Sequence, residues 1–364
     1  MTGVRVSRRT ALSALATVPA LGLGSGVAGC SGDPGRTPNQ PPTGPTGGLA
    51  ARDWATGLSV PWGLEPVADD AVLVTERDTG KILRLSAGTV STVAQVGDAV
   101  KGPEGGLLGL RLGPDHDRLF VYYTTEDDNR VVRYSWNGKQ ATDPRPILTG
   151  IPRAGVHNGG QLRFGSDGSL FVSTGDATVR DNAQDKRSLS GKILRITVEG
   201  DPAPGNPFGN EVWSYGHRNV QGLAFDDTGQ LWASEFGQDT LDELNLISKG
   251  GNYGWPAIEG DESTIDGMTN PKQTWATDDC SPSGLDWWAG SLWMAGLRGE
   301  RLWQIQVNGT GTGTPVAHFA GDYGRLRAVA AFPDGSGLLL GSSNADGRGT
   351  PKPGDDRLLK VAWT

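Results

Sequence analysis

Two short segments combine residue types that can do acid–base and anion-binding chemistry. One of only four histidines, His157, lies in the Gly-flanked segment GVHNGGQ, residues 155–161. An imidazole titrates near neutral pH, so His157 is a candidate proton acceptor; a loop histidine bonded only to backbone is the simpler alternative. In the segment YGHRNVQG, residues 215–222, Arg218 and Asn219 offer hydrogen-bonding groups suited either to an anionic ligand or simply to water at a loop surface.

Further arginines stand at the same stage of later parts of the chain, namely Arg298, Arg325 and Arg327. Guanidinium groups that converge in a partly dry site repel one another unless an anion lies between them. The pattern therefore predicts a polyanionic ligand.

A third group of segments offers oxygen atoms as metal ligands. Carboxylates and loop carbonyls occur together in EFGQDTLDEL, residues 235–244, and in GNYGWP, residues 251–256. Because hard oxygen donors are the ligands that Ca²⁺ prefers, these segments indicate a calcium site. An acidic surface loop is the alternative.

The elements that must position these segments repeat along the chain. From about residue 51 onward, an apolar run, a Gly-containing turn and a second apolar run recur six times, with a period of about 50 residues. This period is typical of propeller blades, so we predict an all-β, six-bladed β-propeller whose C-terminal end pairs with the segment near Trp54. An open pair of β-sandwiches is the alternative. Insertions at 176–190, 198–213 and 248–282 are expected on the binding face.

Composition excludes several classes of protein. The 364 residues include 56 Gly and 12 Trp, which argues against a disordered chain and against a helical bundle. Past the N-terminus there is no uncharged apolar run of ~18 residues, so a multi-pass membrane protein is excluded. The net charge is −8, and no Lys/Arg cluster stands out, so we expect no nucleic-acid partner.

The N-terminal residues are typical of a targeting signal rather than of a folded domain. Residues 1–29 combine Arg8-Arg9, a mildly apolar stretch and the lipobox-like VAGC ending at Cys30. We therefore predict an exported protein, lipid-anchored at the outer face of the cell membrane through Cys30; an ordinary exported protein is the alternative. Residues 30–50 are interpreted as a Pro/Gly-rich tether and residues 51–364 as the propeller. The remaining cysteine, Cys280, is expected to be a small packed side chain.

The chain resembles the soluble pyrroloquinoline-quinone (PQQ) dependent sugar dehydrogenases, in particular the aldose sugar dehydrogenase branch. The resemblance covers roughly residues 52–364. It rests on Thr75-Glu76-Arg77, Gly105-Gly106-Leu107-Leu108-Gly109, His157-x-x-Gly160, Gly175-Asp176, Gly216-His217-Arg218-Asn219, Asp242-Glu243-Leu244-Asn245 and Gly251-Asn252-Tyr253-Gly254-Trp255-Pro256. It implies a six-bladed propeller, in agreement with the repeats, and the oxidation of aldoses to lactones with PQQ and Ca²⁺.

The resemblance also implies roles for single residues. His157 stands where the family has its catalytic base and is also expected to contact the cofactor. Arg218, the second residue expected to be catalytic, and Asn219 match residues that contact PQQ near its reactive carbonyl. Arg325 and Arg327 match the pair that binds quinone carboxylates, and Arg298 replaces a lysine. The carbonyls of Gly237 and Gln238 match those holding the cofactor-side Ca²⁺, whereas Glu243 and Tyr253 resemble a second, structural calcium site.

Three positions depart from the pattern of the family. Val156 replaces an Asp and Gln161 replaces an Arg. Glu104, which is expected among the cofactor-binding residues, stands where the best-known glucose enzyme has Gln. Near a polyanion, the Glu104 carboxyl must bind metal, stay protonated or face away.

The implied partners are a small sugar and an external electron acceptor. Neither the sugar nor the acceptor follows from the sequence. Two other functions stay open: a non-catalytic cell-surface binding propeller, and a metal-dependent lactonase-like hydrolase.

Overall fold

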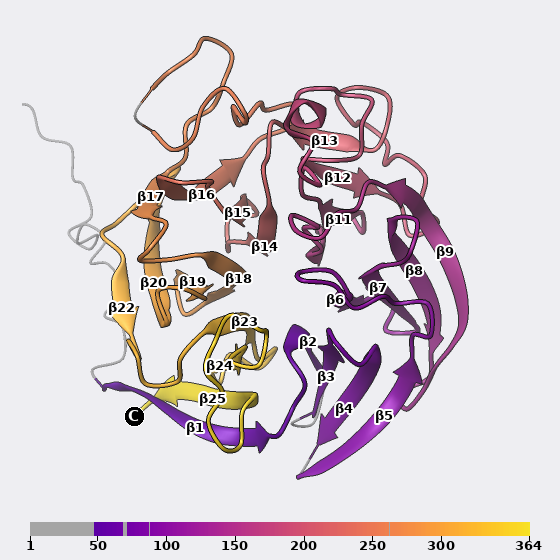
Figure 1. Cartoon of the computed structure of the whole chain (residues 1–364), viewed down its shortest axis with the longest axis vertical. Coiled ribbons are helices and arrows are strands. Elements are labelled where there is room, and N and C mark those ends of the chain that lie inside the picture. Colours follow the sequence, from indigo (N-terminus) through magenta and orange to yellow (C-terminus); the bar gives the residue numbers. More distant parts are fainter. Residues whose placement is uncertain (1–46, 68–70, 87, 262) are drawn as a thin grey trace, which may run out of the picture. The chain divides into compact units, whose positions relative to one another are not determined.

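Six antiparallel sheets form the fold, one for each repeat of the sequence. The computed structural model describes residues 47–67, 71–86, 88–261 and 263–364. Over these residues the sheets are arranged around a common centre, and the chain runs from one sheet to the next around the ring (Figure 1). The predicted all-β, six-bladed β-propeller is therefore confirmed.

Each blade starts with its innermost strand and continues outward in sequence order, except that the outermost strand of blade 6 is β1, from the start of the chain. Blade 1 contains β2 (Pro61–Val67), β3 (Ala71–Glu76), β4 (Lys81–Ser86) and β5 (Thr89–Gln95). Blade 2 contains β6 (Leu107–Leu112), β7 (Arg118–Thr124), β8 (Asn129–Trp136) and β9 (Ala141–Ile151). Blade 3 contains β10 (Leu162–Phe164), β11 (Leu170–Ser173), β12 (Lys192–Ile196) and β13 (Val212–Tyr215), with a 3₁₀ helix, η1 (Arg180–Ala183), between β11 and β12.

The second half of the ring follows the same order. Blade 4 contains β14 (Val220–Phe225), β15 (Leu231–Glu235), β16 (Leu241–Ile247) and β17 (Gln273–Ala276). Blade 5 contains β18 (Pro282–Trp288), β19 (Ser291–Gly296), β20 (Arg301–Asn308), β21 (Gly311–Thr312) and β22 (Val316–His318). Blade 6 contains β23 (Leu326–Ala331), β24 (Leu338–Ser342), β25 (Arg357–Trp363) and β1 (Leu49–Thr56).

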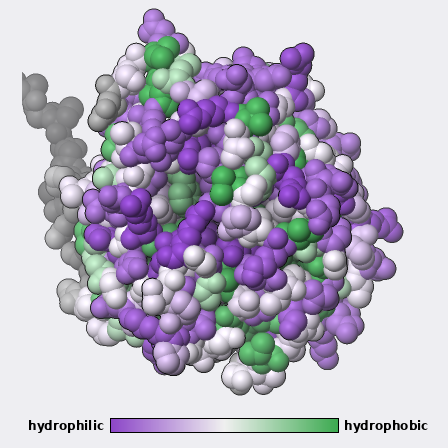
Figure 2. All heavy atoms as spheres, viewed as in Figure 1, coloured by the Kyte–Doolittle hydropathy of each residue, from purple (hydrophilic) through white to green (hydrophobic). Residues whose placement is uncertain are grey.

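The hydrophobic core is divided between the blades. One cluster of buried apolar side chains lies between each pair of neighbouring sheets, as where Leu73 and Ile82 of blade 1 meet Leu110 and Val121 of blade 2. Because both faces of an inner sheet are covered, strands such as β3 and β19 are buried along their whole length. Hydrophilic residues cover most of the face shown in Figure 2, with hydrophobic residues scattered among them.

Short local signals set the blade geometry. The Asp167-Gly168 turn joins β10 to β11, and Gly168 takes the positive φ of 77° that a tight turn needs. Near the axis, Gly109 lets adjacent blades approach: its N–H donates to the carbonyl of Gly160, and a Cβ at Gly109 would lie 2.2 Å from that oxygen. The inner strands therefore converge closely enough for the loops that precede them to meet.

The two ends of the propeller pair as expected. β1 pairs antiparallel with β25, which closes the ring and covers an edge that would otherwise be open. β1 begins at Leu49, two residues before the predicted start of the propeller.

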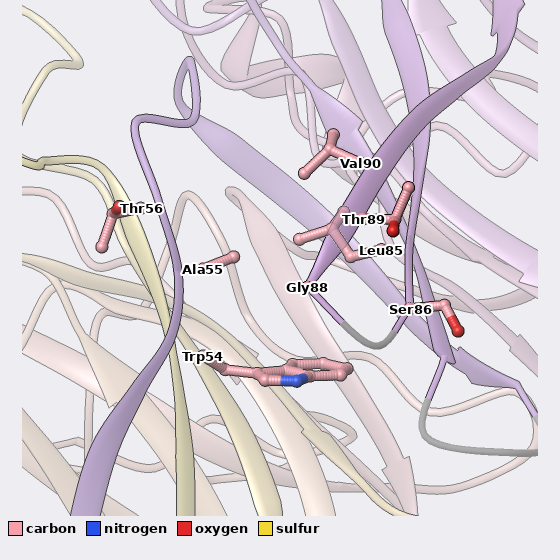
Figure 3. A pocket seen from close by; sticks show the side chains of 8 residues that line it. All are labelled: Trp54, Ala55, Thr56, Leu85, Ser86, Gly88, Thr89 and Val90. Atoms are coloured by element: carbon pink, nitrogen blue, oxygen red, sulfur yellow. The ribbon is translucent and has the colours of Figure 1, made fainter.

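A pocket of about 280 Å³ lies beside this closure, between β1 with Trp54 and the β4–β5 hairpin (Figure 3). None of the described residues that line this pocket is titratable. It therefore lacks the acid–base groups that the sequence places elsewhere.

Most of the predicted N-terminal address and tether lies outside the described residues. This applies to residues 1–46, which include Cys30 and Arg8-Arg9, so the lipid anchor and the export signal stay predictions. Within the ranges that the structure does describe, no helix has the length and apolarity to cross a membrane. Cys280 is a buried free thiol, and burial raises its pKa well above the usual value, as expected for a packed side chain.

Candidate functional site

A polar cavity of about 270 Å³ lies where the loops that lead into the inner strands meet. Seven of the residues predicted for the site line it together: Glu104, His157, Arg218, Asn219, Gly237, Gln238 and Arg298. Four of them, Glu104, His157, Arg218 and Asn219, precede the innermost strands of blades 2, 3 and 4. The other three, Gly237, Gln238 and Arg298, follow the second strands of blades 4 and 5, at the same end of the blade. Asp242, Thr277, Ser281 and Arg348 add polar groups to the wall, and Val156 and Phe236 add apolar ones.

His157 is held as a directed base. Its Nδ1 lies 2.7 Å from Oδ1 of Asp176, whose side chain is 1% exposed. An ionised carboxylate can only accept, so Nδ1 carries the proton of the neutral imidazole and Nε2 is left to accept one. The backbone of His157 adopts a positive φ of 59°, and its N–H donates to Oε2 of Glu104 at 2.9 Å.

Asp176 stays ionised although it is buried. Burial opposes its ionisation, but hydrogen bonds from His157, from the N–H of Thr178 and from Nε1 of Trp255 outweigh this and hold its pKa below the usual value. The approach is close because residue 175 is glycine: a Cβ there would lie 2.0 Å from the carbonyl oxygen of His157. The pair thus resembles the base–carboxylate arrangement that orients a catalytic imidazole.

Arg218 and Asn219 present donors to the cavity. Nε of Arg218 is buried and has no hydrogen-bond partner among the residues that the structure describes. The guanidinium lies over the ring of Trp255, 5.5 Å from its centroid, and burial lowers its pKa. Oδ1 of Asn219 accepts the N–H of Gly159 at 3.1 Å, which leaves the NH₂ of this amide as the free end. A buried donor without an acceptor indicates a ligand that supplies one.

Glu104 faces into the cavity rather than away from it. Besides accepting from His157, it forms an ion pair of 2.8 Å with Arg348, which also lines the cavity. Arg298 lies at the rim, where it pairs with Asp278 at 2.7 Å and both side chains are more than half exposed. Two cations of the wall are therefore paired with acids that a stronger anion could displace.

Arg325 and Arg327 lie behind the cavity wall. Both are buried beside Asp346, with Nε of Arg325 at 3.1 Å and NH2 of Arg327 at 3.6 Å from Oδ2 of this carboxylate. Arg327 also donates to Gln221, and burial lowers its pKa to about 10. Neither residue lines the cavity, so their predicted contact with quinone carboxylates stays a prediction.

Comparisons with known proteins identify the family. The sequence model described as Glucose / Sorbosone dehydrogenase matches residues 58–350. The chain belongs to this family. The PQQ-bound aldose sugar dehydrogenase of Streptomyces coelicolor is 46% identical over 88% of this chain and all of the other, with a TM-score of 0.84.

Other members of the glucose/sorbosone dehydrogenase family are also similar. The aldose sugar dehydrogenase YliI of Escherichia coli is 30% identical over 76% of this chain and 86% of its own length. The quinoprotein glucose dehydrogenase B of Acinetobacter calcoaceticus is 35% identical over 56% of this chain and 52% of its own. The resemblance inferred from the sequence motifs is thereby confirmed.

In this family member, the two calcium predictions fall on neighbouring cavities. Gly237 and Gln238 line the polar cavity of about 270 Å³ described above, which we call the axial cavity. Within the described ranges, neither of their carbonyls accepts a hydrogen bond. Glu243 and Tyr253 line a smaller cavity of about 10 Å³. No group of three or more His, Cys, Asp and Glu side chains in the described part is arranged to hold a metal.

The smaller cavity contains two facing carboxylates. Glu235 and Glu243 are paired across β15 and β16, and Nδ2 of Asn245 bridges them at 3.2 and 3.0 Å. Burial, followed by the charge of Glu235, raises the pKa of Glu243 to about 8. The hydroxyl of Tyr253 is occupied by Leu246 and Ser248, so only its backbone carbonyl is available to a cation. Such a pair needs either a proton or a cation between its members.

Sequence reasoning missed the residues that support the site. Asp176 belonged to a family motif but had no role, although a carboxylate following Gly175 near the candidate base was a usable signal. Arg348 lies in the irregular loop between β24 and β25 and carried no signal. Gln161, one of the departures, is accommodated: its Oε1 accepts the N–H of Leu162 at 3.0 Å.

Proposed function

We propose that the chain oxidises aldose sugars to lactones, using PQQ and a calcium ion held in the axial cavity. The observation that carries the proposal is the His157–Asp176 pair, a directed base that lines the same cavity as Arg218, whose Nε has no hydrogen-bond partner within the described ranges. The PQQ-bound relative from Streptomyces coelicolor supports the choice of cofactor.

The cavity wall suits a molecule with three carboxylates. Arg218, Asn219 and Arg348 offer donors on it, and of the two acids that also line it, Glu104 is bonded to Arg348 and to the N–H of His157, and Asp242 accepts the N–H of Gly237. Bound PQQ supplies the redox chemistry by accepting two electrons. The calcium ion would be held by the carbonyls of Gly237 and Gln238, which have no other partner within the described ranges.

The residues of the chain perform the proton chemistry. Nε2 of His157 accepts the proton of the anomeric hydroxyl, which makes loss of hydride from the same carbon easier. Asp176 keeps the imidazole in the required tautomer and stabilises the imidazolium that forms. Arg218, partly dehydrated against Trp255, places a positive charge where negative charge develops.

Reconstitution tests the proposal directly. Purified protein is stripped with a chelator, then supplied with PQQ, with Ca²⁺ or with both, and reduction of an artificial acceptor is followed with several aldoses. We expect turnover only when both are present and its loss on renewed chelation, because the carbonyls alone cannot fix the quinone. Absence of turnover with every aldose, despite bound PQQ, would leave the binding-propeller alternative standing.

Replacing Glu104 with Gln is expected to tighten PQQ binding about 10-fold, which corresponds to ~1.4 kcal/mol. The change removes a negative charge beside a polyanion and frees Arg348, while the amide oxygen still accepts from His157. The dissociation constant is measured by quenching of tryptophan fluorescence at fixed ionic strength. Glu199→Gln, which removes the same charge from an exposed carboxylate that pairs with Arg118 and Arg133 and does not line the cavity, is the control and should change little. Equal or weaker binding by Glu104→Gln would show that this carboxylate does not oppose the quinone.

A further inference from the structure

The turn at residues 237–241 is bound by a single carboxylate oxygen. Oε1 of Glu259 accepts four consecutive backbone N–H groups, those of Gln238 at 2.8 Å, Asp239 at 2.9 Å, Thr240 at 2.8 Å and Leu241 at 3.2 Å. The N–H that precedes them, of Gly237, donates to Oδ1 of Asp242 at 2.9 Å. Successive amides that converge in this way form an anion-binding concavity.

The direction of these N–H groups fixes the direction of two carbonyls. Cis peptide bonds in the described residues occur only at Trp255-Pro256 and Asp355-Asp356, so the peptides of the turn are trans. In a planar trans peptide the N–H and the C=O point in opposite directions. The peptides that give the N–H groups of Gln238 and Asp239 to Glu259 therefore turn the carbonyls of Gly237 and Gln238 away from it.

Those two carbonyls belong to the axial cavity. Both residues line it, and in the described part of the chain neither oxygen accepts a hydrogen bond. By contrast, the next carbonyls, of Asp239 and Thr240, accept from Thr277. The turn therefore leaves unpaired the two oxygens predicted to hold calcium beside the quinone.

The turn and the Glu259 carboxylate are packed too tightly to move relative to each other. A Cβ at Gly237 would lie 2.0 Å from the carbonyl oxygen of Leu241 and 2.8 Å from Oε1 of Glu259. Glu259 is itself anchored on both sides, since Ile258 donates to the carbonyl of Gly254 and Gly260 donates to Glu243. Four N–H groups that converge on one oxygen suit an ionised carboxylate, which can only accept hydrogen bonds.

We propose that Glu259 is a positioning residue for calcium: it holds the turn so that the carbonyls of Gly237 and Gln238 stay directed at the ion. The inference rests on the proposed function, which it deepens. The carboxylate does not touch the metal. It acts by orienting the ligands, and its charge behind the peptide dipoles makes the carbonyl oxygens better donors to a cation.

The test uses the full chain without PQQ and follows amide hydrogen exchange by mass spectrometry in peptides covering residues 237–241, across a titration of Ca²⁺. In the wild type we expect a protected turn and a further gain of protection on adding Ca²⁺. In Glu259→Ala the turn should exchange about 10-fold faster, and the Ca²⁺ concentration giving half of the protection should rise about 10- to 100-fold. Glu259→Gln keeps the acceptor but not the charge, and should show a smaller shift in the same direction.

Asp261→Ala is the matched control. Asp261 lies two residues after Glu259, and its exposed carboxylate carries the same charge but does not contact the turn. It should behave as the wild type. If folded Glu259→Ala or Glu259→Gln shows unchanged exchange and an unchanged Ca²⁺ midpoint, the inference about Glu259 is wrong, while the proposed function is unaffected. If Ca²⁺ protects no amide of this turn even in the wild type, both this inference and the calcium part of the proposed function fall, whereas PQQ binding is tested separately by its absorption spectrum.

Discussion

Replacing His157 with Asn is expected to lower kcat for aldose oxidation by about 10²–10⁴-fold, the usual contribution of a positioned base. Asn lacks a group that can take the proton of the anomeric hydroxyl. It nevertheless tolerates the positive φ of 59° at this position, so little strain is added. Binding of PQQ, measured by fluorescence quenching, should be largely retained, because the arginines that face the cavity are untouched.

The chain provides a matched control for this substitution. His116 also has a positive φ, of 56°, but it is exposed at another pocket and has no contact with the axial cavity. His116→Asn should leave kcat and the free energy of unfolding nearly unchanged. A His157→Asn enzyme that retains wild-type kcat would show that another group takes the proton, and the proposed mechanism would then be wrong.

The fold could be predicted because its signals are local and repeated. Each blade carries the same succession of apolar runs and Gly turns, and the turn at Asp167-Gly168 illustrates how two residues set a hairpin. Closure of the ring by β1 and β25 followed from the need to cover two strand edges.

The candidate site was only partly predictable, because local and repeated signals specify only some of its residues. His157, Arg218 and Asn219 lie in loops next to inner strands, where the repeat itself directs them to the axis. The contacts of Asp176 and Glu259 depend on the conformation of the long insertions at 176–190 and 248–282, which no period specifies.

Asp346 shows the limit most clearly. It lies in an irregular loop after β24 and binds Arg325 and Arg327, the two residues expected in the cavity. A sequence motif can identify guanidinium groups as candidates for anion binding. It does not show which internal carboxylate already occupies them.

The 176–190 insertion is held by hydrogen bonds from a buried ammonium group. Lys192, the first residue of β12, is fully buried, and its Nζ donates to the carbonyls of Asn182 at 2.6 Å, Ser190 at 2.6 Å and Ala183 at 3.0 Å. Burial lowers its pKa to about 7, which reflects the cost of desolvating the charge. The three carbonyls offset this cost, and through them Lys192 holds the segment that carries Asp176 and Arg180.

Replacing Lys192 with Met is expected to lower the free energy of unfolding by about 3–5 kcal/mol, because three buried carbonyls lose their common donor. The measurement is urea unfolding at pH 6, where the wild-type lysine is charged, and at pH 8; because burial lowers the pKa to about 7, the buried charge costs stability at pH 6, and the loss caused by the substitution should be larger at pH 8. The variant should also lose kcat, since Asp176 on the loosened insertion orients His157 less well, while the exposed residue Lys249 provides the same substitution as a control. A Lys192→Met protein with wild-type stability would mean that the insertion is held by its other contacts, such as the stacking of Arg180 on Trp255, and that the ammonium is dispensable.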